Sequence, residues 1–339
     1  MNQSAQSTHR IAVVGGDGIG PEVTAEAIKV VDACGVDVDW VHYDLGAHRY
    51  LEDGTVLDDE TLDEWRSVDA ILLGAVGDPA PGVAAPAGLV ERGILLRIRF
   101  ELDMYINLRP FRFADDTSHN VDFEVIRENT EGTYAGEGGF LRKGTPHEIA
   151  TQGSVNTRMG VERCIRYAFD RAAATERKHL TLVHKKNVLT FAGDLWQRAF
   201  DIVAADYPSV TTNYQHVDAA CIHFVERPEQ YDVIVTDNLF GDILTDLGGA
   251  ISGGVGFAAS ANLNPDRTGP SLFEPVHGTA PDIAGRGVAN PVAAIISAAL
   301  MCEFLGEDDA AARIQKACAE PTRYTGTTSE IGDAIASQL

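Results

Sequence analysis

The sequence lacks long apolar runs, paired cysteines and an apolar leader segment. No stretch of its 339 residues approaches the roughly 18 apolar residues that a membrane span needs. The opening segment MNQSAQSTHR is polar, unlike a secretory signal. The five cysteines lie far apart with no CxxC pair, which argues against a disulfide framework and a structural zinc site. We therefore expect a cytoplasmic protein without membrane contact.

Basic charge is also scarce. The chain has 27 Lys and Arg residues, of which six are lysines, against 50 Asp and Glu residues, so its formal net charge is −23. A surface this acidic repels phosphate backbones, which argues against a nucleic-acid partner. It also repels itself at low ionic strength, and this favours a salt-adapted, halophilic protein. The alternative is that the acidity only aids solubility.

Apolar runs rich in Val, Ile and Leu alternate with helical patterns. Helices are indicated at 21–35, which begins at Pro21 and ends at Gly35, and at 157–174. The segment 135–154, rich in Gly and Pro, is expected to form a protruding arm. This alternation predicts an α/β fold with buried parallel strands. The predicted strands are 11–15, 70–77, 123–128, 180–184 and 232–238.

Two carboxylates stand four residues apart in FGDILTD, residues 240–246. In a helix, Asp242 and Asp246 would share one face and repel each other by about a few tenths of a kcal/mol. A basic partner or a divalent cation such as Mg²⁺ would offset that repulsion. The competing interpretation is a solvated acidic face.

Glycines also cluster at the start of the chain, in VVGGDGIGPEV. Gly16, Gly18 and Gly20 are followed by Pro21, so the third glycine of the GxGxxG dinucleotide fingerprint is missing. The segment predicts a tight turn into a helix whose N-terminus can face a ligand.

Arginines gather in RIRFELDMYINLRP and FEVIRENTEG. Arginine forks bind carboxylates bidentately. Arg109 and Arg127 are each predicted to close an extended segment, where functional side chains of α/β sheets lie. For Arg97 and Arg99 the alternative is a surface helix with pairing to Glu101 or Asp103.

Three further segments carry candidate groups. Lys185 and Lys186 follow a predicted strand, and a desolvated lysine can act as a base, although a solvated pair is the simpler interpretation. Tyr134 is either a proton donor or a packing residue. The segment 271–291 is predicted to be a long binding loop, and it carries His277, Asp282 and Asn290.

Six motifs in this order resemble the β-decarboxylating dehydrogenase family of isopropylmalate and isocitrate dehydrogenases, and the resemblance covers essentially the whole chain. The motifs are GDGIGPEV, NLRP, RENTEG, HKKNVL, VTDNLFGDILTD and FEPVHGTAPDIAGRGVANP. LLRIRFELD, YQHVDAA and LTLVHKKNVLTFAGDLW are most similar to the isopropylmalate branch, in a form shared by actinobacteria and haloarchaea. The resemblance implies a two-domain fold with a shared mixed sheet, which is not a Rossmann fold. It places 1–104 and 253–339 in an NAD-binding domain and 105–252 in a second domain with dimerisation, metal and substrate sites.

The resemblance also implies roles for the candidate residues. Arg99, Arg109 and Arg127 would clamp the substrate's carboxylates. Asp218, Asp242 and Asp246 would hold Mg²⁺ or Mn²⁺, and Asp218 would also touch the substrate. Lys185 would take the hydroxyl proton and Tyr134 would protonate C3. Lys185 and Asp218 would enter the site from the partner of a homodimer, which the arm completes. Pairing of dimers into tetramers stays open.

The resemblance assigns the adenosine of NAD to the last glycine-rich segment. Asp282 would accept hydrogen bonds from the ribose and repel a 2′-phosphate, which favours NAD over NADP. The implied contact residues are His277, Gly278, Thr279, Ala280, Pro281, Asp282, Ile283 and Asn290.

Substrate choice is expected to depend on ERGILLRIR, which has one residue more between Glu91 and Arg99 than the commoner isopropylmalate form. Ile94, Leu95 and Leu96 offer an apolar wall for an isopropyl group. The expected reaction is oxidation of (2R,3S)-3-isopropylmalate to 4-methyl-2-oxopentanoate, a step of leucine biosynthesis. The alternatives are oxidation of isocitrate, homoisocitrate, tartrate or D-malate, and a non-catalytic regulatory subunit.

Overall fold

The chain divides into two compact units in a computed structural model that describes residues 8–113, 120–320 and 323–339. The first unit comprises the described residues within Met1–Met104, Arg112–Ala114 and Ser252–Leu339, and the second those within Tyr105–Phe111 and Asp115–Ile251. Both units contain strands and helices, so the predicted α/β class is confirmed. Among the described residues, no helix has the length and apolar character to cross a membrane.

The first unit contains five strands in a mixed arrangement. Their order is β2 (Val38–His42), β1 (His9–Gly16), β3 (Ala70–Ala75), β12 (Ser271–Pro275) and β11 (Ala259–Leu263). The first four run parallel, and β11 is antiparallel to β12. The helices are α1 (Gly20–Ala33), α2 (Ala47–Asp53), α3 (Asp59–Trp65), α4 (Arg97–Glu101), α9 (Val292–Leu305), α10 (Asp308–Ala317) and α11 (Thr328–Ala336).

The second unit contains β4 (Ile106–Phe113) up to residue 111, followed in spatial order by β5 (Val121–Glu128), β10 (Val233–Thr236), β8 (His179–His184) and β9 (Thr211–His216). Strands β5, β10, β8 and β9 are parallel. The helices are α5 (Arg158–Ala174), α6 (Thr190–Ala204), α7 (Val217–Glu226) and α8 (Asn238–Ile251). Phe111, Phe123, Phe224 and Tyr231 form an aromatic cluster in its core.

The five predicted strands are confirmed as β1, β3, β5, β8 and β10, and the two predicted helices as α1 and α5. These strands read as apolar runs because they are largely buried. The expected loop at 271–291 is wrong in its first part, because 271–275 form the buried strand β12. That strand ends in Glu274 and Pro275. A charged residue and a proline are unusual in a buried strand, so the sequence does not indicate this one.

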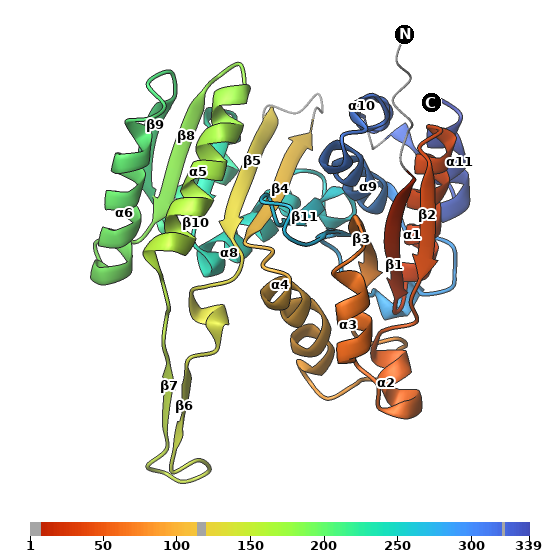
Figure 1. Cartoon of the computed structure of the whole chain (residues 1–339), viewed down its shortest axis with the longest axis horizontal. Helices are drawn as coiled ribbons and strands as arrows, with labels where there is room; N and C mark the ends of the chain where they lie inside the picture. Colours follow the sequence, from red (N-terminus) through yellow and green to blue (C-terminus); the bar gives the residue numbers. More distant parts are fainter. Residues whose placement is uncertain (1–7, 114–119, 321–322) are drawn as a thin grey trace. The chain divides into compact units, whose positions relative to one another are not determined.

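An arm stands apart from the core of the second unit. Strands β6 (Gly138–Leu141) and β7 (Ile149–Gln152) pair only with each other among the described strands, in antiparallel register, and all eight residues are exposed. Figure 1 shows them as a narrow yellow-green ribbon that extends away from α5 and β8. The segment is therefore an arm rather than core, as expected.

Candidate active site

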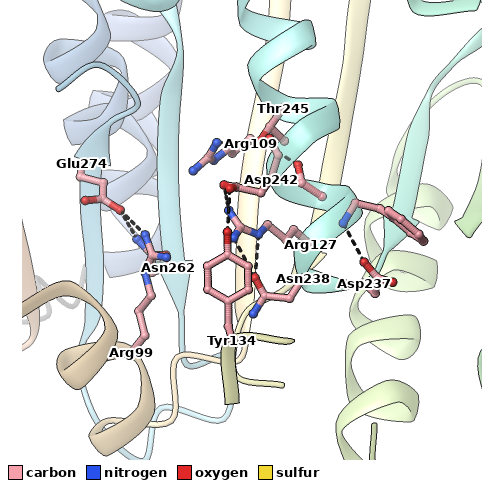
Figure 2. Close-up of polar contacts among 12 residues, drawn as sticks. Arg99, Arg109, Arg127, Tyr134, Asp237, Asn238, Asp242, Thr245, Asn262 and Glu274 are labelled. Carbon is pink, nitrogen blue, oxygen red and sulfur yellow. Dashed lines mark hydrogen bonds and ion pairs between the residues drawn. The ribbon is translucent and has the colours of Figure 1, made fainter. Parts of the chain in front are cut away.

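Arg127 is the centre of the polar site in the second unit. It is the penultimate residue of β5 and is 1% exposed. Its Nε and Nη2 donate to Oδ1 of Asn238 at 3.0 and 2.7 Å, and its Nη1 donates to Oδ1 of Asp242 at 2.6 Å (Figure 2). Both partners lie in the first turns of α8, so the end of β5 and the start of α8 form one largely buried polar cluster.

Tyr134 contacts the same carboxylate from the short helical turn Thr133–Ala135. Its hydroxyl donates to Oδ2 of Asp242 at 2.7 Å (Figure 2), and the Arg127 guanidinium lies 5.2 Å from the centre of its ring. Burial and the hydrogen bond to Asp242 raise the pKa of Tyr134 above its ordinary value of 10.0. The phenol therefore remains protonated at neutral pH and can act as a proton donor.

Arg109 reaches α8 as well. Its Nη1 donates to Oγ1 of Thr245 at 2.6 Å, one residue before Asp246 (Figure 2). The prediction that Arg109 closes an extended segment is wrong, because β4 continues to Phe113. Arg109 is 7% exposed, so it is held inside the unit rather than at a strand end.

Asp242 and Asp246 lie on α8, which confirms the predicted helix and their common face. Asp242 is half-buried and Asp246 is exposed. Two carboxylates one turn apart are a suitable donor set for a hard cation. Within the described part of the chain, no three His, Cys, Asp or Glu side chains converge as a metal site. One chain alone therefore does not bring Asp218 to the other two aspartates.

Asp218 is instead paired with the other predicted catalytic residue. It lies at the start of α7, and its Oδ1 accepts a hydrogen bond from Nζ of Lys185 at 2.6 Å. This hydrogen bond holds the pKa of Asp218 below its ordinary value. Lys186 is turned elsewhere, since its Nζ lies 4.0 Å from the centre of the Tyr214 ring.

Arg99 belongs to the first unit, where it lies on α4. Its Nη2 donates to Oε1 of Glu274 at 3.0 Å, and Asn262 donates to the same oxygen at 2.8 Å (Figure 2). The surface-pairing alternative is wrong for Arg99, because it is 8% exposed and bound to β12. Arg97 pairs with Asp59.

The segment before α4 is a π-helical turn, Glu91–Leu96, in which the amide of Arg97 donates to the carbonyl of Arg92, five residues back. A turn of this kind accommodates one extra residue in a helix. Ile94 is fully buried in the core of the first unit, so its predicted place in an apolar wall is wrong. Leu95 and Leu96 stay partly exposed and remain available to a substrate.

The predicted nucleotide loop lies beside the glycine turn of the first unit. The amide of Ile19 donates to the carbonyl of Thr279 at 2.9 Å, and a Cβ on Gly18 would come within 2.0 Å of that carbonyl oxygen. Nε2 of His277 is buried without a hydrogen-bond partner among the described residues, and burial lowers the pKa of this ring. Asp282 is exposed, so its carboxylate is free to face a ligand. An orphaned ring nitrogen and an exposed carboxylate on the same loop are polar groups that fit the adenosine of NAD.

Asn290 and Ala280 have structural roles in this loop. Oδ1 of Asn290 accepts from the amide of Val292, the first residue of α9. Ala280 has a positive φ of 41°, which turns the chain into the short helix Pro281–Ile283. The backbone of the loop is therefore set before any ligand binds.

Several residues of the site carry no clear signal in the sequence. Asp17 accepts the amides of Ala47, His48 and Gly77, and so joins the loops that follow β1, β2 and β3. Glu274 and Asn238 hold the arginines described above. Asn238 stands four residues before Asp242, a spacing that could have revealed it; the others depend on contacts between remote segments.

Comparisons with known proteins agree on one family. The sequence profile described as isocitrate/isopropylmalate dehydrogenase matches residues 10–337. A protein of Nocardia farcinica named 3-isopropylmalate dehydrogenase is 56% identical over 97% of this chain and its own full length. Proteins of the same name from Corynebacterium glutamicum and Mycobacterium tuberculosis are 55% and 56% identical, over 97% of this chain and 99% and 100% of their own.

Two solved structures have the same fold. The isocitrate dehydrogenase of Methylococcus capsulatus is similar with a TM-score of 0.86 and 38% identity, over 98% of this chain and 99% of its own. The TT0538 protein of Thermus thermophilus has a TM-score of 0.85 and 32% identity, over 100% of this chain and 70% of its own.

Proposed function

The chain belongs to the isocitrate/isopropylmalate dehydrogenase family, and on that premise we propose that it acts as a 3-isopropylmalate dehydrogenase. The observation that carries the proposal is the 56% identity to 3-isopropylmalate dehydrogenases over nearly the whole chain. The reaction converts 3-isopropylmalate and NAD⁺ to 4-methyl-2-oxopentanoate, CO₂ and NADH. It serves leucine biosynthesis.

The arginines bind the two carboxylates of the substrate. Arg109 and Arg127 are held by α8 through Thr245, Asn238 and Asp242, so their guanidinium groups are fixed before substrate binds. Preorganised arginine forks give both charge and geometry to carboxylate recognition. Arg99, the third arginine that the family resemblance implies, lies in the first unit, where Glu274 orients it.

Proton transfers belong to Lys185 and Tyr134. Lys185 accepts the proton of the C2 hydroxyl as C2 is oxidised, and Tyr134 donates a proton to C3 after C3 loses CO₂. The raised pKa of Tyr134 suits a donor. Asp242 and Asp246, joined by Asp218, would hold Mg²⁺ or Mn²⁺. Bound there, the cation would supply a Lewis acid at the substrate's oxygens, and NAD⁺ would supply the hydride acceptor.

Asp282 favours NAD⁺ over NADP⁺. Its exposed carboxylate can accept hydrogen bonds from ribose hydroxyls, while its charge disfavours a 2′-phosphate.

The proposed function is tested by NAD⁺ reduction by the purified protein in molar KCl with 3-isopropylmalate and Mg²⁺. We expect activity that EDTA abolishes and added Mg²⁺ restores, with much weaker reduction of NADP⁺. Activity that survives complete chelation would contradict the metal proposal.

A homodimer completes the active site in this proposal. Apolar side chains remain exposed on α7 and α8, at Ile222, Val225, Leu239 and Ile243, and on the arm at Phe140, Leu141 and Ile149. Helices α7 and α8 pack together, so their exposed side chains are candidates for one continuous apolar surface, the kind that marks a protein interface. A second copy covering it would bring its Lys185 and Asp218 to Asp242 and Asp246.

Mixing two inactive variants tests this shared site. Lys185→Ala and Asp242→Asn disable different halves of each site, so one of the two sites in a mixed dimer is intact. After unfolding and refolding together, random pairing should restore about a quarter of the wild-type activity. No recovery, with both variants folded and dimeric, would show that each site is built from a single chain.

Isocitrate is the second candidate substrate, because a solved isocitrate dehydrogenase is 38% identical over almost the whole chain. The partly exposed Leu95 and Leu96 favour an apolar substituent instead. A third carboxylate at that position would lack a polar partner from these two side chains, which disfavours binding.

A further inference from the structure

Two functional segments of the second unit begin at neighbouring strand ends. Val183 of β8 pairs with Thr236 of β10, and Oγ1 of Thr236 donates to the carbonyl of Val183 at 2.8 Å. The next residues of the two segments are His184 and Asp237. Lys185 follows the histidine directly, and α8 follows the aspartate.

His184 is completely buried at this point. Its ring stacks on Trp196 at 5.9 Å between centres and meets Phe240 in a T-shaped contact at 5.6 Å. Nε2 lies 3.2 Å from Oδ2 of Asp237, within ion-pair distance, and neither ring nitrogen forms a hydrogen bond in the described part of the chain. Asp237 therefore provides the polar contact of a histidine that is otherwise enclosed by aromatic rings.

Asp237 is also the N-cap of α8. Its Oδ1 accepts from the amide of Phe240 at 2.8 Å, and its carbonyl accepts from the amide of Gly241 at 2.9 Å. One carboxylate thus holds the first turn of α8 with one oxygen and faces His184 with the other. The position of the helix start is tied to the position of the histidine ring.

The surrounding packing leaves His184 little freedom. A Cβ on Gly193 of α6 would lie 2.5 Å from Cα of Lys186 and 3.2 Å from Nδ1 of His184. Helix α6 therefore presses directly on the segment that carries both lysines. A shift of the ring would move this backbone, and Lys185 with it.

We propose that His184 is a positioning residue that sets, through Asp237, the spacing between the Lys185 segment and the first turns of α8. Those turns carry Asn238 and Asp242, the two partners of Arg127. The inference rests on the proposed function, since it assigns Lys185 to proton transfer and Asp242 to the cation. In the proposed dimer each chain gives Lys185 to one site and α8 to the other, so loss of one buried contact in both chains impairs both properties.

Two matched variants separate the contact from mere burial. In His184→Gln the side-chain amide nitrogen occupies a position comparable to Nε2 and keeps the close contact with Asp237. In His184→Asn the amide is one carbon shorter and does not reach it. Both variants bury a neutral amide, so we expect comparable losses of thermal stability. Only the asparagine variant should lose function.

The readouts are kcat, KM for 3-isopropylmalate and the Mn²⁺ dissociation constant, the last measured from the EPR signal of free Mn²⁺ without turnover. For His184→Asn we expect kcat to fall about 10-fold to 100-fold. We expect the Mn²⁺ dissociation constant to rise about 10-fold, the lower end of the range for residues that support metal ligands. His184→Gln should stay within about 3-fold of the wild type in both.

Asp237→Ser completes the design, because serine keeps an N-cap oxygen for α8 but is too short to reach His184. It should reproduce the losses of His184→Asn, and the double variant should be no worse than either single variant. Thr181→Val changes another buried polar residue of β8 and serves as the control.

The outcomes distinguish this inference from the proposed function. Equal kcat and Mn²⁺ affinity in the wild type, His184→Asn and Asp237→Ser would overturn the positioning role. Equal losses in His184→Gln and His184→Asn would also overturn it, since burial alone would then explain them. A wild type inactive on 3-isopropylmalate would refute the proposed function instead, and the Mn²⁺ measurements would still test whether the contact positions α8.

Discussion

His48 lies between two carboxylates in the first unit. Nδ1 is 2.7 Å from Oδ1 of Asp17, and Nε2 is 2.6 Å from Oδ1 of Asp44. Because ionised carboxylates only accept hydrogen bonds, the ring donates to both only when each nitrogen carries a proton. Burial alone would lower the pKa of His48, but the hydrogen bonds and charges of Asp44 and Asp17 together raise it above 6.5. The charged ring thus fastens the loop after β2 to the glycine turn.

This contact predicts a pH-dependent contribution to stability. The pKa of His48 is higher in the folded than in the unfolded chain, so the stabilisation is complete below about pH 6.5 and is lost as the pH rises through the folded-state pKa. His48→Gln should therefore melt below the wild type near pH 6, and the difference should shrink toward alkaline pH. Thermal unfolding across this range measures it. His42→Gln, exposed on β2, is the control, and a difference that widens with pH would contradict the assignment.

Single residues of the site could be predicted from the sequence, but the residues that they contact could not. Arg99, Arg109 and Arg127 are recognisable because cations are scarce in this chain and each stands in a motif. Their partners come from remote segments: Glu274 is 175 residues from Arg99 and Asn238 is 111 residues from Arg127. Which remote group meets a side chain depends on strand order, and no local pattern encodes it.

Gly241 decides how closely α8 approaches β5. A Cβ there would lie 2.4 Å from Cγ and 2.7 Å from Cβ of Arg127. These atoms belong to the root of a side chain whose tip is bound to Asn238 and Asp242, so the side chain cannot move away freely. Glycine is needed here for space rather than for backbone conformation.

Gly241→Ala should therefore lower both stability and substrate affinity. Alanine favours the helix by about 1 kcal/mol, but overpacking of a core contact costs about 1 to 3 kcal/mol, and the anchored arginine leaves little room for relaxation. We expect a lower Tm and a raised KM for 3-isopropylmalate. Gly139→Ala, whose added Cβ would meet nothing within 4 Å, should leave both unchanged. A Gly241→Ala protein more stable than the wild type would contradict this packing.

The strands that can be predicted from the sequence are the buried ones. Buried parallel strands such as β3 and β10 appear as apolar runs, whereas β9 is half exposed and reads TTNYQH. The edge strands β2 and β9 carry polar residues because only part of each is covered, so periodicity alone misses them. The extra residue at 91–99 is visible in the sequence, but the π-turn at 91–96 and the burial of Ile94 in the core are not, because an apolar run does not show which of its residues face the core.

The acidity of the whole chain predicts dependence on salt. A net charge of −23 gives strong self-repulsion in dilute buffer. The Debye length falls from about 10 Å at 0.1 M to about 3 Å at 1 M, so the repulsion is screened in molar salt. We expect Tm to rise steadily with KCl. Tetramethylammonium chloride at equal ionic strength should act alike if screening is the cause, and a Tm indifferent to both salts would refute salt adaptation.

Substrate choice is the property on which the proposed function depends most. The direct measurement is kcat/KM for NAD⁺ reduction with 3-isopropylmalate, isocitrate, homoisocitrate, D-malate and tartrate, in molar KCl with Mg²⁺, together with identification of the keto-acid product. We predict the highest kcat/KM for 3-isopropylmalate and formation of 4-methyl-2-oxopentanoate. Preference for isocitrate or homoisocitrate would contradict the apolar substrate site, and inactivity on all five substrates by a folded dimer would indicate a non-catalytic subunit.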